Sequence, residues 1–477
     1  MKTTPKWNWW ALLPLLIVFG LALGARCMYL IECTDHGQRD AALEVQGAFP
    51  LSHHPAGTSF RSRATPTQLD NLVAKVSEQH EFACLAPLSD KDGPTAHTAP
   101  GFPWLHGMLV AYFVDSADSI LRWLNCALGG LTIVCYFLFA WRVFHSTLVA
   151  SIAGLFIAIH PFSIINTAEL NDGVLVSFLL SMCLLVGTRG IQEGGAFTGL
   201  LFGILLAALV MVRAALLPFA TVALLGFLWQ SRHLPMGWFV GFLALIGFVN
   251  GIAPWTLRNY QLLERPVPIA DSTYLHLWMG NNPHFTGATL SEPVLRESLR
   301  TAMTEKRFEE LLAEDNRKVR YNLLAPEVWR EVQEQPTKTV TRRISSALAF
   351  MMGERWFRYE SVSRPHEPSE TSAPCPEWLT DNVEVALQGT LLAVFILAFL
   401  GWRWSALWRD HGCLAAIAML WIPLPFILSH AEHLSGPRLP LDGVLLCYAA
   451  FAVVSLVPGL VKLPRPPAAS KKENASR

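Results

Sequence analysis

Apolar residues in this chain gather in long runs separated by short polar joints, which is typical of membrane-spanning helices. The first run extends from Trp9 to Leu30, about the length of the roughly 20 apolar residues that cross a bilayer. It is too long for a signal peptide and lacks a small-residue cleavage site, so it predicts an uncleaved anchor. Further runs predict spans near residues 119–141, 147–165, 173–188, 197–212, 214–230, 237–256, 385–402, 413–430 and 441–460, which makes about ten in all.

Two long polar stretches interrupt this series, one from Glu32 to about Ala96 and one at about 257–384. The short joints orient the spans, because cytoplasmic joints carry the excess of Lys and Arg. One side holds the basic residues Lys2, Lys6, Arg142, Arg189, Arg232, Arg403, Arg409, Lys462, Arg465, Lys471, Lys472 and Arg477. The other side holds two acids and two arginines, namely Glu169, Asp172, Arg213 and Arg438. We therefore expect both termini in the cytoplasm and both polar stretches outside it.

The segment Gly101 to Val114 is apolar but short, and Pro100 and Pro103 stand at its start. Counted as a span, it would invert every later segment and place Arg142 outside. We interpret it as a helix that lies in the outer membrane interface with one apolar face half buried.

The chain thus divides into four predicted regions. Residues 1–256 form a transmembrane module that includes a first outer loop at 31–118, and residues 257–384 form an outer segment. Residues 385–461 form the last spans, and 462–477 a disordered cytoplasmic tail. In the outer regions, helical patterns occur after Thr65-Pro66 and at 305–312, 326–334 and 342–352. We expect an integral, multi-pass protein of a bacterial inner or plasma membrane.

Composition and charge exclude some functions. Charged residues make up 16% of the 477 residues, against about 25% in soluble domains. The 37 basic and 37 acidic residues balance, so no basic excess points to nucleic acid. None of the nine cysteines forms a CxxC zinc pattern. A disulfide between Cys33 and Cys84 is compatible with an oxidising outer compartment, and two free thiols are equally compatible with the sequence.

Four charged residues at predicted outer helix ends are candidates for chemistry: Asp35, Asp172, Arg213 and Arg438. A charge at the membrane boundary is costly when it faces lipid, so it usually faces a water-filled cavity or a partner. Each also has a structural interpretation. Asp35 is compatible with a solvated loop, Asp172 with an N-cap of the helix that starts at Gly173, and Arg213 with a side chain that snorkels to the headgroups. Arg438 is compatible with an interfacial anchor.

Outer acids, outer arginines and many spans together suit sugar transfer from a lipid phosphate. A carboxylate accepts the proton of the incoming hydroxyl. Arginines neutralise the departing phosphate in bidentate geometry, and a groove between helices holds the lipid tail.

Several sequence motifs resemble those of the GT-C glycosyltransferases, in particular family 39, which contains protein O-mannosyltransferases and lipid A aminoarabinose transferases. The main stretch is Ala253-Pro-Trp-Thr-Leu-Arg-Asn-Tyr260, followed by Val267-Pro-Ile and Leu277-Trp-Met-Gly-Asn-Asn-Pro283. Shorter motifs follow the family order at Ala99 to Trp104, Arg122 to Phe144, Glu331 to Pro336 and Pro437 to Leu441. Together they cover most of the chain.

The resemblance implies a GT-C-type bundle of about ten transmembrane helices with extracytoplasmic juxtamembrane helices and a small extracytoplasmic helical segment. It implies that Asp35 is the general base, although His36 replaces the second acid of the family's pair. That departure leaves Asp40 as a competitor. Asp172 matches the second-loop acid, and Arg213 and Arg438 match positions expected to contact the lipid phosphate.

Three further residues complete the candidate site. His97 either binds phosphate or acceptor or caps the helix that follows it. Asn281 and Asn282 follow Gly280 in a predicted turn, which the family places beside the active site. We expect no cofactor and no metal, although His430, Glu432 and His433 cluster near Arg438.

The expected function is transfer of a hexose or pentose, with inversion, from a polyprenyl-phosphate donor to a glycan, lipid or protein. The alternatives are a transporter or flippase without covalent chemistry, and a non-catalytic scaffold. A transporter would favour inverted repeats and polar mid-span helices, and the sequence has no evident example of either.

Overall fold

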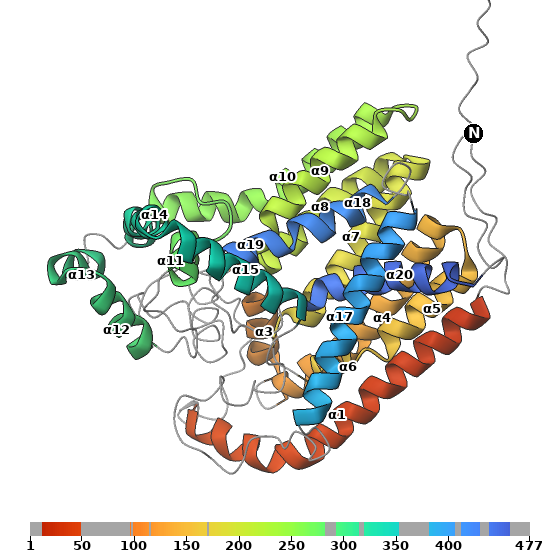
Figure 1. Cartoon of the computed structure of the whole chain (residues 1–477), viewed down its shortest axis with the longest axis horizontal. Helices are drawn as coiled ribbons and strands as arrows, with labels where there is room; N and C mark the ends of the chain where they lie inside the picture. The colour runs from red at the N-terminus through yellow and green to blue at the C-terminus, as the bar shows by residue number, and fades with distance from the viewer. Residues whose placement is uncertain are drawn as a thin grey trace, which may run out of the picture.

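The computed structural model of the chain is built from helices, and no β-strand occurs in the part that the structure describes. The predicted all-α class is confirmed. Most of the helices pack into one bundle, and α11 to α14 lie to one side of it (Figure 1). The described residues are 12–48, 96, 99–113, 116–168, 171–281, 292–313, 319–352, 381–405, 412–429 and 438–457; at 32–48, 110–111, 292–296, 320, 349, 352 and 381–388 the description is limited to the helical backbone.

Each predicted span coincides with a helix or a pair of helices. Five stretches are long and apolar enough to cross a membrane, and they lie in α1 (Leu12–Ala48), α4 (Ala117–Phe144), α7 (Gly173–Glu193), η4 (Ala214–Leu216) with α9 (Leu217–Ser231), and α10 (Gly237–Leu263). The others are shorter: α5 (Thr147–Ala158), α8 (Ala196–Val212), α17 (Asp381–Ser405), α18 (Cys413–Trp421) with α19 (Pro423–Ser429), and α20 (Leu439–Ser455). This supports an integral membrane protein; the number of spans and their orientation stay predictions.

Two predicted spans are divided by proline. The run at 147–165 splits into α5 and α6 (Pro161–Ile165), and the run at 413–430 splits at Ile422 before α19. Proline lacks the N–H that would continue the preceding helix and disfavours helical backbone in the residue before it. Each split therefore follows from the sequence, although the hydrophobic pattern alone missed it.

Glycines let the helices of the bundle approach closely. On α8, a Cβ atom at Gly199 would meet the carbonyl oxygen of Val240, and one at Gly203 would meet that of Ala244. On α17, a Cβ at Gly401 would meet the carbonyl oxygen of Tyr448 on α20. Small residues at such contacts are the usual means of packing helices in membranes, and these contacts fix α8 on α10 and α17 on α20.

The ambiguous apolar segment forms α3 (Gly101–Tyr112), a helix of 12 residues. At 1.5 Å per residue it is about 18 Å long, too short to cross a hydrocarbon core of about 30 Å. It packs against α4 and the end of α8, where a Cβ at Gly101 would lie 2.8 Å from the carbonyl oxygen of Met211. A short helix at this position is confirmed, and its place in the outer membrane interface stays a prediction.

Helix α1 is longer than predicted. It continues through the polar residues after Leu30 to Ala48, for 37 residues in all. The sequence placed Asp35 and Asp40 in an outer loop, and the structure places both within this helix. Polar residues such as Glu32, Gln38 and Arg39 are acceptable helix formers, so loss of hydrophobicity marked the end of the apolar face and not the end of the helix.

The segment after α10 folds around a second, smaller hydrophobic core. Its helices are α11 (Thr273–Asn281), α12 (Glu292–Ala302), α13 (Glu305–Leu312), η6 (Arg320–Leu324), α14 (Ala325–Glu334) and α15 (Pro336–Met352). Leu275, Trp278, Leu311 and Tyr321 are buried in this core. Helices α13 and α14 agree with the helical patterns of the sequence, whereas α15 begins at Pro336, before the pattern predicted at 342–352. The division of the chain into regions stays a prediction.

The longest recognised motif is held together by hydrogen bonds at the start of this segment. The Trp255 indole N–H donates to the carbonyl oxygen of Ile269 at 2.8 Å, and the Asn259 side chain donates to the carbonyl oxygens of Val267 and Ile269 at 3.1 and 3.0 Å. Thr256 donates to Pro268 at 2.9 Å. The 253–260 stretch on α10 therefore fixes the backbone at 267–269, which leads into α11.

Candidate functional site

The predicted site residues divide into those that the structure describes and those that it does not. Asp172, Arg213, Arg438 and Asn281 are described with their side chains, and Asp35 and Asp40 only as backbone of α1. His97, Asn282, His430, Glu432 and His433 lie outside the described residues, as do Cys84 and the predicted helix after Thr65-Pro66. The side chain of Cys33 also lies outside them.

Asp172 stands at the N-cap position of α7 but makes no side-chain capping bond. The cap is provided by its neighbour, because Asn171 Oδ1 accepts a hydrogen bond from the backbone N–H of Gly173 at 2.8 Å. The interpretation of Asp172 as a simple N-cap is therefore wrong. Its carboxylate is available for another partner, and that partner is Arg213.

Arg213 ends α8 in an extended backbone conformation, with φ −138° and ψ 99°. This break between α8 and η4 turns the side chain towards the start of α7. Arg213 Nε donates to Asp172 Oδ2 at 2.8 Å and Nη2 donates to Asp172 Oδ1. This two-point geometry is the strong arrangement of a guanidinium with a carboxylate. Arg213 thus binds a carboxylate in the structure, and the expectation that it only snorkels to headgroups is wrong.

The Asp172–Arg213 pair lies at the end of the bundle where α7 starts and α8 ends, here called the outer end. The Asp172 side chain is 9% exposed and that of Arg213 is 17% exposed. Arg122 Nε on α4 donates to the carbonyl oxygen of Ala168 at 3.0 Å and so holds the chain that precedes Asp172. The pair is therefore fixed but retains access from outside.

Arg438 is enclosed more completely than the sequence suggested. Its side chain is 2% exposed, and its Nε donates to Asp442 Oδ1 at 2.6 Å, one turn later on α20. Its Nη2 donates to the carbonyl oxygen of Leu391 at 3.3 Å. Its Nη1 has no hydrogen-bond partner in the described part of the chain. Arg438 is not an exposed interfacial anchor; its predicted contact with phosphate stays a prediction.

Arg26 is a buried charge that the sequence reading overlooked. It lies on α1, is 0% exposed and donates to Ser163 Oγ at 2.5 Å and to the carbonyl oxygens of Ala22 and Ala158. Its guanidinium passes over Gly129, where a Cβ atom would lie 2.7 Å from Nε. The signal was present, because an arginine inside a predicted span is costly unless it has partners.

His160 connects Arg26 and Arg438. His160 Nε2 lies 3.7 Å from Asp442 Oδ2, and the ring is close enough to both arginines for their charges to act on it. This second group of charged side chains therefore joins α1, the α5–α6 joint and α20 inside the bundle.

Asn281 ends α11 and does not lie in a turn, so the turn predicted at Gly280 and Asn281 is wrong. Its side chain donates to the carbonyl oxygen of Leu277 at 2.7 Å, as a residue within a helix does. The free carbonyl oxygens at the end of α11 are bound by α15: Arg342 donates to Asn281, and Arg343 donates to Gly280. The two guanidinium groups therefore supply the hydrogen-bond donors that these carbonyl oxygens would otherwise find in a turn.

Burial shifts several pKa values in the segment after α10. It lowers the pKa of His276 to about 4, which keeps this ring neutral at pH 7. Burial, together with the neighbouring Arg342, lowers the pKa of Arg343 to about 10. Burial also raises the pKa of Asp271, against the opposing effect of its partner Arg265. Among the described residues, no group of three or more His, Cys, Asp or Glu side chains could hold a metal ion.

Two solved structures resemble the chain. One is the archaeal oligosaccharyltransferase AglB from Archaeoglobus fulgidus, in complex with an inhibitory peptide and a dolichol-phosphate, with 14% identity and a TM-score of 0.46. The other is an Archaeoglobus fulgidus oligosaccharyltransferase tethered by a disulfide bond to an acceptor peptide with the NVT sequon, with 15% identity and a TM-score of 0.47.

Each alignment covers 94% of this chain and 50% of the other, so the chain spans about half the length of the two solved proteins. TM-scores under 0.5 leave a shared fold unestablished. No protein-family model matches the sequence, and no curated protein matches it either.

Proposed function

We propose that the chain is a membrane glycosyltransferase of GT-C type, related to family 39. It moves a hexose or pentose from a polyprenyl-phosphate donor to a hydroxyl group of a glycan, lipid or protein at the extracytoplasmic face. The observation that carries the proposal is the Asp172–Arg213 pair, a partly exposed guanidinium fixed by two hydrogen bonds to a buried carboxylate at one end of the bundle. The ordered sequence motifs give it its chemical class.

The proposed reaction is a single displacement. Asp35 accepts the proton of the acceptor hydroxyl, whose oxygen attacks the anomeric carbon of the donor sugar. A new glycosidic C–O bond forms while the C–O bond to the lipid phosphate breaks, and the electron pair leaves with the phosphate. Attack opposite the leaving group inverts the anomeric configuration.

Arg213 and Arg438 neutralise the charge that develops on the departing phosphate. Asp172 orients the substrate and holds Arg213 in place, so that little reorganisation is needed when the bond breaks. For Arg438, the nitrogen free to act is Nη1. His97, Asp40, Asn281 and Asn282 remain proposed contacts to the donor or the acceptor.

The experiment is a transfer assay in membrane vesicles with labelled polyprenyl-phosphate hexoses and pentoses. We expect Asp35→Asn to abolish transfer while the amount of protein in the membrane is unchanged. Glu44→Gln, on the same helix α1, is the matched control and should retain transfer.

Full transfer by Asp35→Asn would remove Asp35 from the mechanism. Movement of the labelled lipid across the vesicle membrane without a covalent product would replace the proposal with transport. The configuration of the product, determined by NMR, tests inversion independently.

A further inference from the structure

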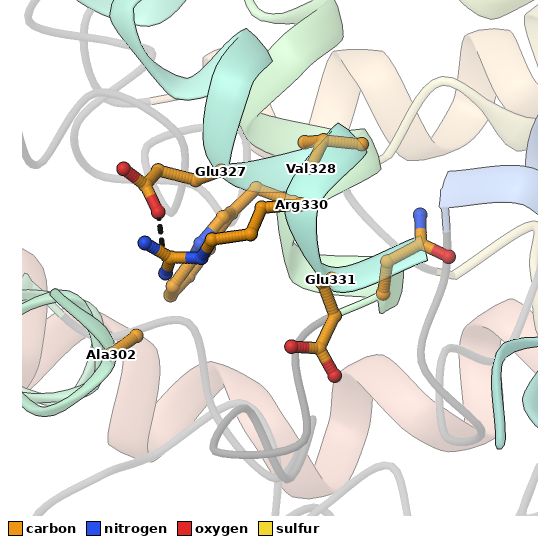
Figure 2. Close-up of a pocket in the computed structure, with 7 residues that line it drawn as sticks. Ala302, Glu327, Val328, Arg330 and Glu331 are labelled. Atoms are coloured by element: carbon orange, nitrogen blue, oxygen red, sulfur yellow. Dashed lines mark ion pairs between the residues drawn. The ribbon is translucent and has the colours of Figure 1, made fainter. Parts of the chain in front are cut away.

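A small cavity lies in the segment after α10, away from the Asp172–Arg213 pair. It has a volume of about 180 Å³ and lies between α11, the end of α12 and α14 (Figure 2). This is the volume of about six water molecules, and it is smaller than the roughly 300–1,000 Å³ of pockets that enclose drug-sized ligands. A ligand group the size of one sugar ring fits such a space.

The lining combines planar polar groups with an aromatic wall. Glu327, Arg330 and Glu331 come from α14, and Trp278 and Asn281 come from α11. In Figure 2 the Glu327 carboxylate and the Arg330 guanidinium face each other, and the Glu331 carboxylate lies across the opening from Ala302. Such a set can donate and accept hydrogen bonds in fixed directions while contacting a ring.

The charges of this cavity are balanced by its own surroundings. Arg330 Nη2 lies 2.6 Å from Glu327 Oε2, and Arg307 Nε lies 3.8 Å from Glu327 Oε1. Arg342 Nη2 lies 3.5 Å from Glu331 Oε1. Because each carboxylate already has a cationic neighbour, the cavity neither attracts an anion strongly nor requires a cation. It favours a neutral polar ligand.

Hydrogen-bond acceptors without donors extend from the cavity along α14 and α15. Glu331 Oε1, Gln335 Oε1 and Thr339 Oγ1 are buried and have no hydrogen-bond partner in the described part of the chain. Glu331 lies on α14, Gln335 directly follows the end of that helix, and Thr339 lies on α15. A buried acceptor that lacks a donor is unfavourable. Of the three residues, only Glu331 lines the cavity, and a ligand hydroxyl group at its carboxylate would supply a donor.

The cavity is also linked to the candidate site through the fold. Arg343 donates to the carbonyl oxygens of Gly280 on α11 and Ile427 on α19. A Cβ at Gly280 would lie 2.8 Å from the carbonyl carbon of Ser429. Helix α19 also packs against η4, the element that directly follows Arg213. The 7 residues of α19 span about 10 Å, so one short helix joins the cavity to the Asp172–Arg213 pair.

From these observations we infer that the cavity lined by Trp278, Asn281, Glu327 and Glu331 binds a neutral sugar residue of the acceptor, which is therefore a glycan. The role of the cavity as an acceptor subsite rests on the function proposed above. Its ability to bind a sugar does not depend on that function. The balanced carboxylates accept hydrogen bonds from the ring hydroxyls, and Arg330 donates to a ring or hydroxyl oxygen. Trp278 provides an apolar wall for the ring.

The test measures binding directly, on the full chain in lipid nanodiscs, by saturation-transfer NMR. The probes are methyl glucoside, methyl mannoside, N-acetylglucosamine and glucuronic acid. We expect at least one neutral probe to bind and glucuronic acid to bind at least tenfold more weakly. Ala302→Trp, which fills the cavity, and Glu331→Leu, which removes an acceptor, should each weaken binding at least tenfold.

Glu309→Leu is the matched control, because this carboxylate is exposed on α13 outside the cavity, and it should leave binding unchanged. If either cavity variant fails to fold, Glu331→Gln provides the milder substitution, with an expected loss of at least threefold. Absence of binding by every neutral probe overturns the inference, and so does binding that these substitutions do not change.

The transfer assay separates this inference from the proposed function. Ala302→Trp should raise the KM for the acceptor with little change in kcat if the cavity is an acceptor subsite. Sugar binding without any transfer by the native chain would sink the proposed function and retain the sugar site. Transfer by the native chain without sugar binding at the cavity would retain the proposed function and overturn the sugar site.

Discussion

Asp172 and Arg213 join two helices at an accessible end of the bundle, whereas Arg438 and Asp442 lie one turn apart on α20 and are enclosed by it. Both pairs are Arg–Asp contacts of short distance. The Arg213 side chain is 17% exposed and that of Arg438 is 2% exposed. Arg213 is therefore more open to water and to a ligand than Arg438 is.

The surroundings of the two pairs differ as much as their exposure. Both oxygens of Asp172 accept from Arg213, so this carboxylate is satisfied by one partner. Asp442 Oδ2 and Arg438 Nη1 have no hydrogen-bond partner among the described residues, although His160 lies 3.7 Å from that oxygen. An enclosed pair of this kind fixes the geometry of a fold but adds little net stability. The accessible pair is the better candidate for chemistry.

The largest expected effect comes from breaking the enclosed pair. Arg438→Met leaves Asp442 buried without its cation, and we expect a loss of about 3–5 kcal/mol in the free energy of unfolding. The double variant Arg438→Met/Asp442→Leu removes both charges and should recover most of that loss, since well-packed apolar replacements of such pairs are often neutral. Thermal unfolding of the purified protein in detergent measures both.

Equal stability of the single and double variants would show that the loss comes from packing and not from the unpaired charge. The double variant also sharpens the functional question. If it folds and still transfers sugar at the native rate, Arg438 does not hold the departing phosphate. If it folds and loses transfer, Arg438 has a second role beyond the fold.

For the Asp172–Arg213 pair we expect a larger effect on transfer than on stability. We expect Asp172→Asn to reduce kcat about 100- to 1,000-fold, the usual effect of removing one fixed electrostatic group from a transition state. Its cost in stability should be smaller than that of Arg438→Met, because Arg213 can still reach solvent. The transfer assay and the unfolding curve of the same preparation test the two expectations together.

Arg213→Lys provides the matched comparison for this pair. Lysine retains the positive charge but cannot make the two parallel hydrogen bonds of a guanidinium, so kcat should fall by less than in Asp172→Asn. Native transfer by Asp172→Asn would contradict a role for this pair in the reaction.

The sequence predicted the helices better than it predicted the contacts between them. Hydrophobic runs of bilayer length located each apolar helix or helix pair, and the shortness of the run at 101–112 marked α3 as a short helix. The joints before Pro161 and Pro423 were visible as proline signals but were outweighed by the continuous apolar run. Helix α1 was ended too early, because hydropathy reports the surroundings of a residue and not its backbone conformation.

The sequence drew attention to charged residues that form ion pairs in the structure, but it did not predict which residues pair with each other. Asp172 and Arg213 were both singled out, yet their contact joins residues 41 positions apart, and no periodicity encodes it. Asp442 and His160 were not considered, although both stand at helix starts close to singled-out residues. The cavity beside Trp278 depends on how α11, α12 and α14 pack, so only the structure could reveal it.

The smallest expected effect belongs to a third pair, an Arg–Glu contact at the opposite end of the bundle. Arg142 Nη1 lies 2.7 Å from Glu193 Oε1, with side chains 20% and 31% exposed. Arg189 Nε lies 2.9 Å from the other oxygen of Glu193, so this carboxylate keeps a cation when Arg142 is lost.

Exposed pairs contribute about 0–1 kcal/mol and are screened by salt. Arg142→Gln should therefore change stability by less than about 1 kcal/mol, a difference that 0.5 M salt removes, and should leave transfer unchanged. A large loss of transfer in Arg142→Gln would show that a cation at either end of the bundle matters for the reaction, and the contrast between an accessible functional pair and the other pairs would then fail.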